Sequence, residues 1–194
     1  MEWVLSIGKR TISIIMVVLL LEMFVISEGE IFASYYVFPG RYINGHITYK
    51  AVSGSNSYYA NIARNCWNGK SSNVSISYYS GSDPNDADLR TNFNKLDSPT
   101  AGQLGITFLF YQGVVVDAYS NWDQATCVQY KDSSYENENQ KLKTCVHEIG
   151  HALSMAHPQE SLIDSVMRQG LRNSYVLTTY DKACLIYKWG GSVC

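Results

Sequence analysis

The sequence lacks a strong net charge of either sign. Of its 194 residues, 15 are Lys or Arg and 17 are Asp or Glu, for a formal net charge of −2 at pH 7. A protein that binds nucleic acid through phosphates needs a clustered basic surface, and the sequence shows no such cluster. We therefore expect no nucleic acid partner. Internal repeats and low-complexity tracts are absent too, so we expect one domain without a repeat architecture.

Long apolar stretches are absent beyond the N-terminus. Residues 11–26 are almost wholly apolar and follow two basic residues. This order is typical of a secretory signal peptide, and the apolar stretch is shorter than the ~20 residues of a membrane-spanning helix. We predict a signal peptide over residues 1–33, cleaved before Ser34. A cleavage site nearer Ser27 or Gly29, and a membrane anchor in place of a signal peptide, are the alternatives.

Removal of this segment would change the charge balance. It holds two basic and four acidic residues, so 13 of each sign remain in residues 34–194. These 161 residues are enough for one domain with a single substantial core. We predict a secreted, extracellular protein that has no membrane contact after signal removal, and we expect a monomer.

Cysteine is absent from the first 65 residues, and the rest of the chain contains five cysteines, which is an odd number. Secretion permits disulfides, but at least one thiol must stay free or pair with another molecule. Cys184 with Cys194 and Cys127 with Cys145 are candidate pairs, while the alternative for Cys66 and Cys145 is that they are small buried apolar residues. The positions are Cys66, Cys127, Cys145, Cys184 and Cys194.

Histidine is scarce and unevenly distributed. The chain has four, and His147, His151 and His157 fall within eleven residues. Residues four apart in an α-helix lie about one turn apart, so His147 and His151 project toward a single ion. Glu148 lies about 100° around the same helix, better placed to take a proton from zinc-activated water than to bind metal. We predict one catalytic zinc ion with Glu148 as general base.

The third histidine requires a break in the helix. Six more helical residues would turn His157 about 240° away from His151 and move it about 9 Å along the axis. Pro158 follows, and the residue before a proline is pushed out of the helical region. We predict that the helix ends before His157, which then returns to the ion. His46 is expected to be an ordinary strand residue, since three histidines already complete a catalytic zinc set.

The spacing of His147, Glu148, His151 and His157 resembles the signature of the metzincin zinc metalloproteases. The segment 165–167 is similar to the Met-turn beneath the zinc in that family, which implies a structural role for Met167. Gln169 stands where some branches of the family have tyrosine, so the chain looks closer to the matrixin-like branch.

One position departs from the family pattern. Ser154 stands where the metzincin signature has glycine, which lets the chain turn sharply after the helix with a positive φ. A serine adopts that conformation at a cost of roughly 1 kcal/mol, so we predict a strained turn at this position.

The resemblance implies an α+β, zincin-like fold. It implies a twisted mixed sheet of about five strands, an active-site helix, a second packing helix and a C-terminal helix. Residues 34–194 would form one catalytic domain with the zinc cleft between 34–157 and 158–194, and residues 168–176 would wall the specificity pocket. An extended protein or peptide substrate would add to an antiparallel edge strand, assigned to 125–130 or the adjoining hairpin.

Hydrophobic periodicity predicts the individual elements. Helical spacing favours a helix within 55–67, the helix of the histidines, and a last helix that opens on a capping box of Thr178 with Asp181. Residues 80–97 are interpreted as a polar connection. The β-rich or alternating segments favour strands at 42–50, 74–79, 105–111, 113–119 and 125–130.

The polar connection contains Asp83, Asp86 and Asp88. Clustered carboxylates in a secreted protein raise the hypothesis of a Ca²⁺ site, but their spacing matches no standard calcium loop. A solvated surface loop is favoured.

These observations predict a secreted zinc-dependent metalloendopeptidase that hydrolyses peptide bonds. Two other functions stay open at this point. One is a non-catalytic, zinc-containing protein-binding module, and the other is a zinc hydrolase acting on cell-wall amide bonds.

Overall fold

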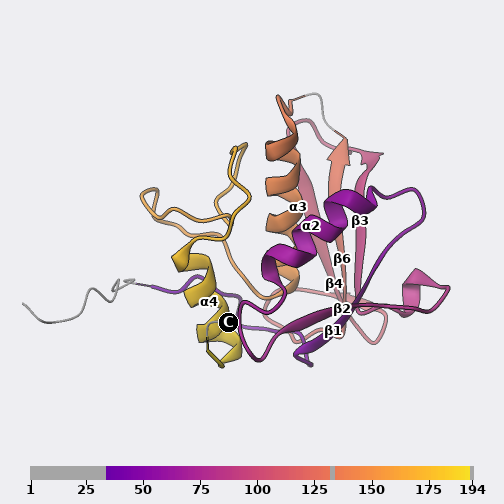
Figure 1. Ribbon diagram of the computed structural model, residues 1–194, viewed down its shortest axis with the longest axis horizontal. Helices are drawn as coiled ribbons and strands as arrows, with labels where there is room; N and C mark the ends of the chain where they lie inside the picture. Colours follow the sequence, from indigo (N-terminus) through magenta and orange to yellow (C-terminus); the bar gives the residue numbers. More distant parts are fainter. Residues whose placement is uncertain (1–33, 132–133, 193–194) are drawn as a thin grey trace, which may run out of the picture. The chain divides into compact units, whose positions relative to one another are not determined.

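A six-stranded sheet, ordered β2-β1-β3-β6-β4-β5, forms the framework of the fold. The structure is a computed structural model that describes residues 34–131 and 134–192. Figure 1 shows the sheet with its helices. In chain order the elements are β1 His46–Ala51, α2 Ser57–Trp67, β2 Ser75–Tyr78, the short 3-10 helix η1 Pro84–Asp86, β3 Leu89–Asp97, β4 Gly105–Tyr111, β5 Val114–Val116, β6 Gln124–Lys131, α3 Glu138–Ala152 and α4 Thr179–Trp189.

The sheet is mixed. The neighbours β2, β1, β3 and β6 are parallel, whereas β4 runs antiparallel to β6 and forms a hairpin with β5. The hairpin turns at Gln112 and Gly113, whose φ angles of 51° and 79° fit a two-residue type I′ turn. The predicted α+β fold is confirmed, with six strands where about five were expected.

The position of β6 corrects one prediction. Residues 125–130 lie inside the sheet, between β3 and β4, so their assignment as the antiparallel edge strand is wrong. The alternative, the adjoining hairpin of β4 and β5, is at the edge. A strand paired on both sides has no backbone groups left for a substrate, so of the two predicted candidates only the hairpin can accept an added strand.

The central strand β3 lies where a polar connection was predicted, so that prediction is wrong for residues 89–97. Leu89, Thr91 and Phe93 are buried and alternate with partly exposed polar residues. This is the period-two pattern of a strand. Only two of its three inward residues are apolar, which explains why the pattern resembled a polar loop.

The helices α2 and α3 cover one face of the sheet (Figure 1). The N-cap of α2 is Asn56, and Trp67 at its other end donates from Nε1 to the carbonyl of Val146 in α3, 2.8 Å away. In α3 every residue from Leu142 to Gly150 is buried. A helix enclosed to this degree can offer polar side chains only to an internal cleft or to neighbouring backbone.

The capping box of α4 is confirmed: Thr178 accepts from the amide of Asp181, whose carboxylate accepts from the amide of Thr178. The four described cysteines are free thiols, so Cys127 and Cys145 are not bridged. Cys194 and the predicted signal peptide lie outside the described residues.

The acidic residues of the connection serve separate hydrogen bonds. Asp83 caps η1, Asp86 accepts from the Tyr79 hydroxyl, and Asp88 accepts from the amide and hydroxyl of Thr48. Their carboxylates are not grouped around a common ion position in the described part of the chain.

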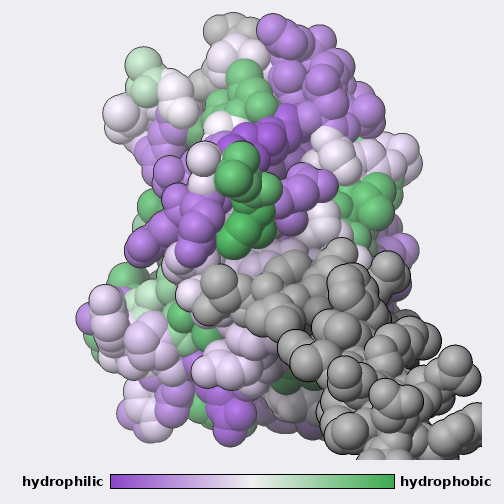
Figure 2. All heavy atoms as spheres, turned by 90° about the vertical axis from the view of Figure 1, so that its left-hand side faces the viewer, coloured by the Kyte–Doolittle hydropathy of each residue, from purple (hydrophilic) through white to green (hydrophobic). Residues whose placement is uncertain are grey.

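The surface seen in Figure 2 is mostly hydrophilic, with small, separate groups of apolar side chains. Within residues 34–131 and 134–192, no helix combines the length and apolar character needed to cross a membrane.

Candidate metal centre

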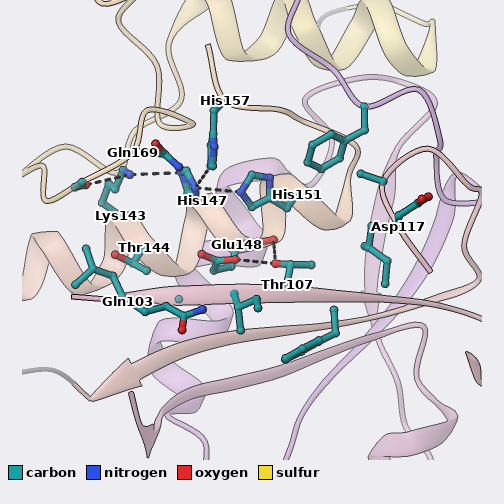
Figure 3. Close-up of a pocket in the computed structure, with 18 of the residues that line it drawn as sticks. Gln103, Thr107, Asp117, Lys143, Thr144, His147, Glu148, His151, His157 and Gln169 are labelled. Atoms are coloured by element: carbon teal, nitrogen blue, oxygen red, sulfur yellow. Dashed lines mark hydrogen bonds between the residues drawn. The ribbon is translucent and has the colours of Figure 1, made fainter. Parts of the chain in front are cut away.

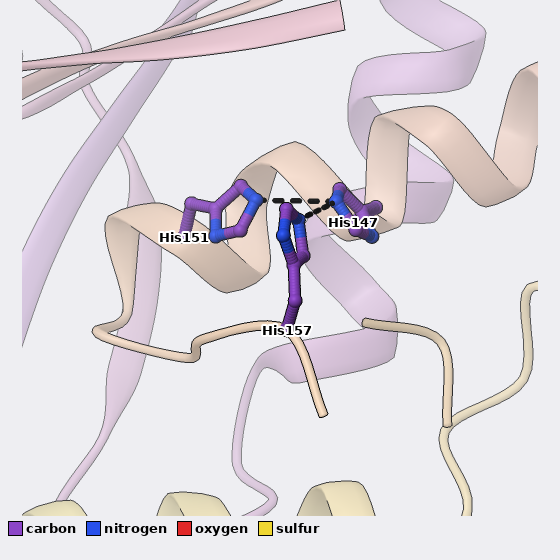
Figure 4. Close-up of side chains that lie close together, drawn as sticks. All are labelled: His147, His151 and His157. Atoms are coloured by element: carbon purple, nitrogen blue, oxygen red, sulfur yellow. Dashed lines mark hydrogen bonds between the residues drawn. The ribbon is translucent and has the colours of Figure 1, made fainter. Parts of the chain in front are cut away.

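Three imidazoles converge at the C-terminal end of α3 (Figure 4). Nε2 of His147 lies 3.1 Å from Nε2 of His151 and 2.9 Å from Nε2 of His157. Within the described residues, this is the one group of three or more His, Cys, Asp or Glu side chains close enough to share a metal ion. His46 lies elsewhere, at the start of β1, with Nδ1 2.7 Å from the hydroxyl of Ser75.

The chain turns sharply after α3, as predicted. The helix ends at Ala152, and Ser154 has a φ of 72°. Its amide donates to the carbonyl of His151, and the amide of Met155 donates to that of Gly150. These two bonds define a Schellman motif with serine at the left-handed position, which glycine usually occupies. The turn directs the chain back, so that His157 faces the helix it has just left.

The serine at this turn carries two unfavourable features. A left-handed φ strains a residue with a Cβ, and the buried hydroxyl of Ser154 has no hydrogen-bond partner among the described residues. We expect Ser154→Gly to raise the free energy of unfolding by about 1 kcal/mol. The relief of strain in the folded state should exceed the opposing effect of glycine, which increases the entropy of the unfolded chain. Urea unfolding at saturating zinc measures this change.

A matched variant separates the two features. Ser154→Ala removes the unpartnered hydroxyl but keeps a Cβ in the left-handed conformation. It should recover only the part of the gain that comes from the hydroxyl. A Ser154→Gly protein less stable than wild type would show that this turn is not strained.

The N-terminal segment 36–38 pairs with the turn. Val37 forms an antiparallel bridge with Met155, the amide of Phe38 donates to the carbonyl of Ser154 at 2.7 Å, and the amide of Ala156 donates to that of Tyr36 at 3.0 Å. The ring of Phe38 stacks on His151, with centroids 5.5 Å apart. Residues more than 110 positions away in sequence thus hold the segment between the second and third histidines.

Backbone carbonyls determine which ring nitrogens face the centre. Nδ1 of His147 lies 3.0 Å from the carbonyl oxygen of Val166, and Nδ1 of His151 lies 2.8 Å from that of Met155. A carbonyl can only accept, so both Nδ1 atoms carry the proton. Each Nε2 therefore presents a lone pair to the centre. Two lone pairs about 3 Å apart repel each other unless a cation lies between them.

Electrostatics keep these rings neutral. Burial, with the neighbouring histidines and Lys143, lowers the pKa of His147 well below its usual range and that of His151 to about 3. Burial and Lys143 lower the pKa of His157 as well. Neutral imidazole is the form that binds a metal.

The Met-turn lies directly beneath the helix. Met167 packs so closely on α3 that a Cβ added to Gly150 would lie 2.4 Å from its sulfur. Only glycine at position 150 therefore permits this contact. The preceding carbonyl, that of Val166, is the acceptor for His147. The predicted structural residue Met167 thus lies against the part of α3 that carries the first two histidines.

A buried carboxylate anchors the Met-turn to α4. Asp181 is 1 % exposed and accepts from the hydroxyl of Ser165 and the amide of Val166, as well as from Thr178. The sequence pattern gave Asp181 only a capping role. The same side chain also holds the turn whose carbonyl orients His147, a link that no local pattern reveals.

Glu148 lies on the β4 side of the histidines (Figure 3). Its Oε2 is 2.8 Å from the hydroxyl of Thr107, and a Cβ added to Gly105 would lie 2.6 Å from its Oε1. Burial raises the pKa of Glu148 to about 8, while Thr107 and the ammonium of Lys143 act in the opposite direction. A group with this pKa binds a proton readily, and the positive charge of a bound zinc ion would favour its ionised form, which a proton acceptor requires.

Lys143, one turn before His147 on α3, was not singled out from the sequence. It is 3 % exposed, and Nζ donates to the carbonyl of Arg168 and lies 3.4 Å from that of Gly170. Burial lowers the pKa of Lys143 to about 8. The ammonium is still mostly protonated at neutral pH.

A cleft of about 700 Å³ runs along β4 and past the histidines. Figure 3 shows Lys143, Thr144, Gln103 and Gln169 toward one end of it and Asp117 toward the other. The three histidines and Glu148 line its middle. A ligand in the cleft would therefore lie between the sheet edge and the candidate metal centre.

The donor set fits zinc. Three neutral nitrogens bound at about 2.0–2.1 Å in a tetrahedral arrangement lie roughly 3.3 Å apart, close to the observed 2.9 and 3.1 Å. Three histidines with an open fourth position are a known catalytic zinc set. The hydrogen bonds from Nδ1 of His147 and His151 to backbone carbonyls are of the kind that orient metal-binding imidazoles from outside the coordination sphere.

Comparisons with known proteins give the family and the fold. A model of the reprolysin-like metallopeptidases of family M12B matches residues 46–158. Two solved structures of myroilysin share the fold, each at 16 % sequence identity. The first has a TM-score of 0.51, and the match covers 81 % of this chain and 99 % of the myroilysin chain. The second has a TM-score of 0.50, and the match covers 77 % of this chain and 85 % of the myroilysin chain. No curated protein sequence matches the chain.

Proposed function

This chain belongs to the reprolysin-like metallopeptidases of family M12B, and on that premise we propose that His147, His151 and His157 hold its zinc. This confirms the metzincin resemblance at the family level. The matching group is the reprolysin-like one, whereas the sequence looked closer to the matrixin-like branch. The chain is a zinc metallopeptidase, and we infer that it is an endopeptidase with Glu148 as general base. The convergence of three Nε2 atoms beside the buried Glu148 supports this assignment.

Glu148 would act on the proton of the attacking water. A bound zinc ion polarises the peptide carbonyl and acidifies water. The carboxylate of Glu148 accepts the proton and then delivers it to the leaving amine, for which its high proton affinity is suited. The Thr107 hydroxyl, 2.8 Å from Oε2, holds the carboxylate in place.

The open part of β4 would bind the substrate backbone. The hairpin partner β5 pairs only with Leu109–Tyr111, and the carbonyls of Leu104 and Phe110 accept from amides on the β6 side. Antiparallel pairing alternates, so the backbone groups of Gly105 and Thr107 face away from β6, toward the cleft. They are available to an extended peptide by strand addition.

We also propose that the enzyme is secreted. The basic start and short apolar stretch of residues 1–33 support this, and a protease outside the cell meets protein substrates without endangering its own cytosol. The first residue of the protein recovered from the culture medium would reveal the cleavage site.

Zinc quantification combined with cut-site mapping tests the function. We expect about one zinc per chain, internal cleavage of peptides in a library, and complete loss of cleavage after chelation with recovery on zinc addition. Cleavage of muropeptides but not peptides would replace the proposal with a cell-wall amidase. Zinc binding without turnover on either panel would indicate a non-catalytic module.

A further inference from the structure

We propose that the Lys143 end of the cleft binds an acidic side chain of the substrate, so that the enzyme cuts beside aspartate or glutamate. This inference rests on the proposed function and adds to it the substrate class. It follows from the donors of Lys143, the surrounding charge and the direction of β4.

The ammonium of Lys143 keeps hydrogen-bonding capacity for a ligand. It has three N–H donors, of which one is used by the carbonyl of Arg168 and a second is weakly engaged by that of Gly170 at 3.4 Å. Nδ1 of His147 is also 3.4 Å away, but it cannot accept because it donates its own proton to Val166. One donor at the cleft wall is therefore left for a substrate.

The ammonium of Lys143 has no ion-pair partner among the described residues. Glu148 and Asp181 act on its charge only from a longer distance, and their carboxylates accept hydrogen bonds from Thr107 and from the Met-turn instead. Buried charges are normally paired, because an unpaired one loses its hydration without compensation. A substrate carboxylate would supply the missing charge.

A second cation reinforces the first. Arg172, in the segment predicted to wall the specificity pocket, is close enough for its charge to act on Lys143. Its Nε is buried and has no hydrogen-bond partner among the described residues. Two neighbouring cations repel each other, so an anion that binds between or beside them is favoured by both.

The direction of β4 indicates which substrate residue this is. The strand starts at Gly105, just after Gln103 at the Lys143 end, and runs toward the Asp117 end (Figure 3). A peptide added antiparallel, the commoner pairing, runs the opposite way and places its C-terminal half beside Lys143. The acidic residue would then follow the scissile bond. Lys143 is the one Lys or Arg among the described residues that line the cleft, and the other end carries the carboxylate of Asp117. That end therefore has no cation to bind an acidic side chain.

Matched peptides test the inference on the wild-type enzyme. They share one sequence with an amidated C-terminus and differ only after the cut, with Asp, Glu, Asn, Gln or Lys at that position. We expect kcat/KM for Asp or Glu to exceed that for the matching amide by about 10- to 100-fold, with Lys lowest. Equal rates for acid and amide would overturn the inference while leaving the endopeptidase intact, whereas no cleavage of any peptide would count against the proposed function itself.

The amidated ends distinguish the source of the carboxylate. A preference seen only with free C-termini would mean that Lys143 binds the chain end, which contradicts a side-chain subsite. An acidic preference before the cut would reverse the inferred direction and likewise contradict the assignment.

Variants connect the preference to Lys143. In Lys143→Gln the ratio of acid to amide rates should fall to near one with zinc content unchanged, and in Lys143→Arg it should persist. Lys95→Gln, at an exposed position on β3, is the control and should keep the wild-type ratio. A folded Lys143→Gln protein with an intact preference would refute the assignment, and if that variant fails to fold, the wild-type peptide series decides alone.

Discussion

Replacing Glu148 with glutamine is expected to lower kcat by about 10²–10⁴-fold while leaving the zinc content unchanged. Glutamine has nearly the shape of glutamate and its carbonyl oxygen can still accept from Thr107, 2.8 Å away in the wild type. It cannot take a proton from water. The orientation of His147 and His151 does not depend on Glu148, since backbone carbonyls orient both rings. The variant therefore separates proton transfer from metal binding.

Single-turnover cleavage of one peptide, together with metal analysis of the same sample, measures both quantities. Glu136→Gln, at an exposed position just before α3, is the matched control and should retain wild-type activity. Equal cleavage by the Glu148→Gln and wild-type proteins would mean that another group is the base. Loss of zinc from Glu148→Gln would instead show that the carboxylate helps to hold the metal.

The features predicted from the sequence are those that depend on local geometry. The spacing of His147 and His151 is read from the helical repeat, and the return of His157 follows from Pro158 and the distance along the chain. The strain at Ser154 was predicted in the same way and is seen as a φ of 72°. In each case a few consecutive residues determine the structure.

The features that were missed depend on contacts between distant segments. The pairing of Val37 with Met155 and the bond from Asp181 to the Met-turn join residues that no periodicity relates. Lys143 looks like an ordinary charged helical residue until the loop 168–170 is seen to bury it. β3 was missed because its inward Thr91 made a buried strand look polar.

These contacts orient the first two histidines in the same way. Each of the first two ligands is oriented by a carbonyl from a different segment: Val166 in the Met-turn for His147, and Met155 in the Schellman turn for His151. The Met-turn is held by Asp181 of α4, and the Schellman turn is held by the N-terminal segment 36–38. Both ends of the described chain therefore contribute to ligand geometry. Neither Asp181 nor the segment 36–38 is part of the histidine motif.

His157→Ala is expected to abolish detectable peptidase activity and to weaken zinc binding by more than about 100-fold, since loss of even an outer contact to a ligand costs 10- to 100-fold. The remaining histidines leave the ion with two protein ligands. The fold should survive, because His157 is only half-buried and lies on a loop after α3 rather than in the core.

Thermal unfolding with and without zinc distinguishes ligand loss from misfolding. A ligand that binds only the folded state stabilises it by about 4 kcal/mol at a concentration 1,000 times its Kd. Wild type should therefore melt at a higher temperature with zinc, and His157→Ala should show little or none of this shift while its metal-free melting temperature stays near that of the metal-free wild type. Removing one of three mutually repelling imidazoles does not destabilise the metal-free protein.

The fourth histidine supplies the matched control for this experiment. His46→Ala removes the same side chain from an exposed position at the start of β1, where Nδ1 contacts only the hydroxyl of Ser75 among the hydrogen-bond partners described. It should keep both the zinc-dependent melting shift and the activity. A His157→Ala protein that retains full zinc occupancy and turnover would place the third ligand elsewhere. That result would leave the sharp turn at Ser154, and the strain stored in it, without a function.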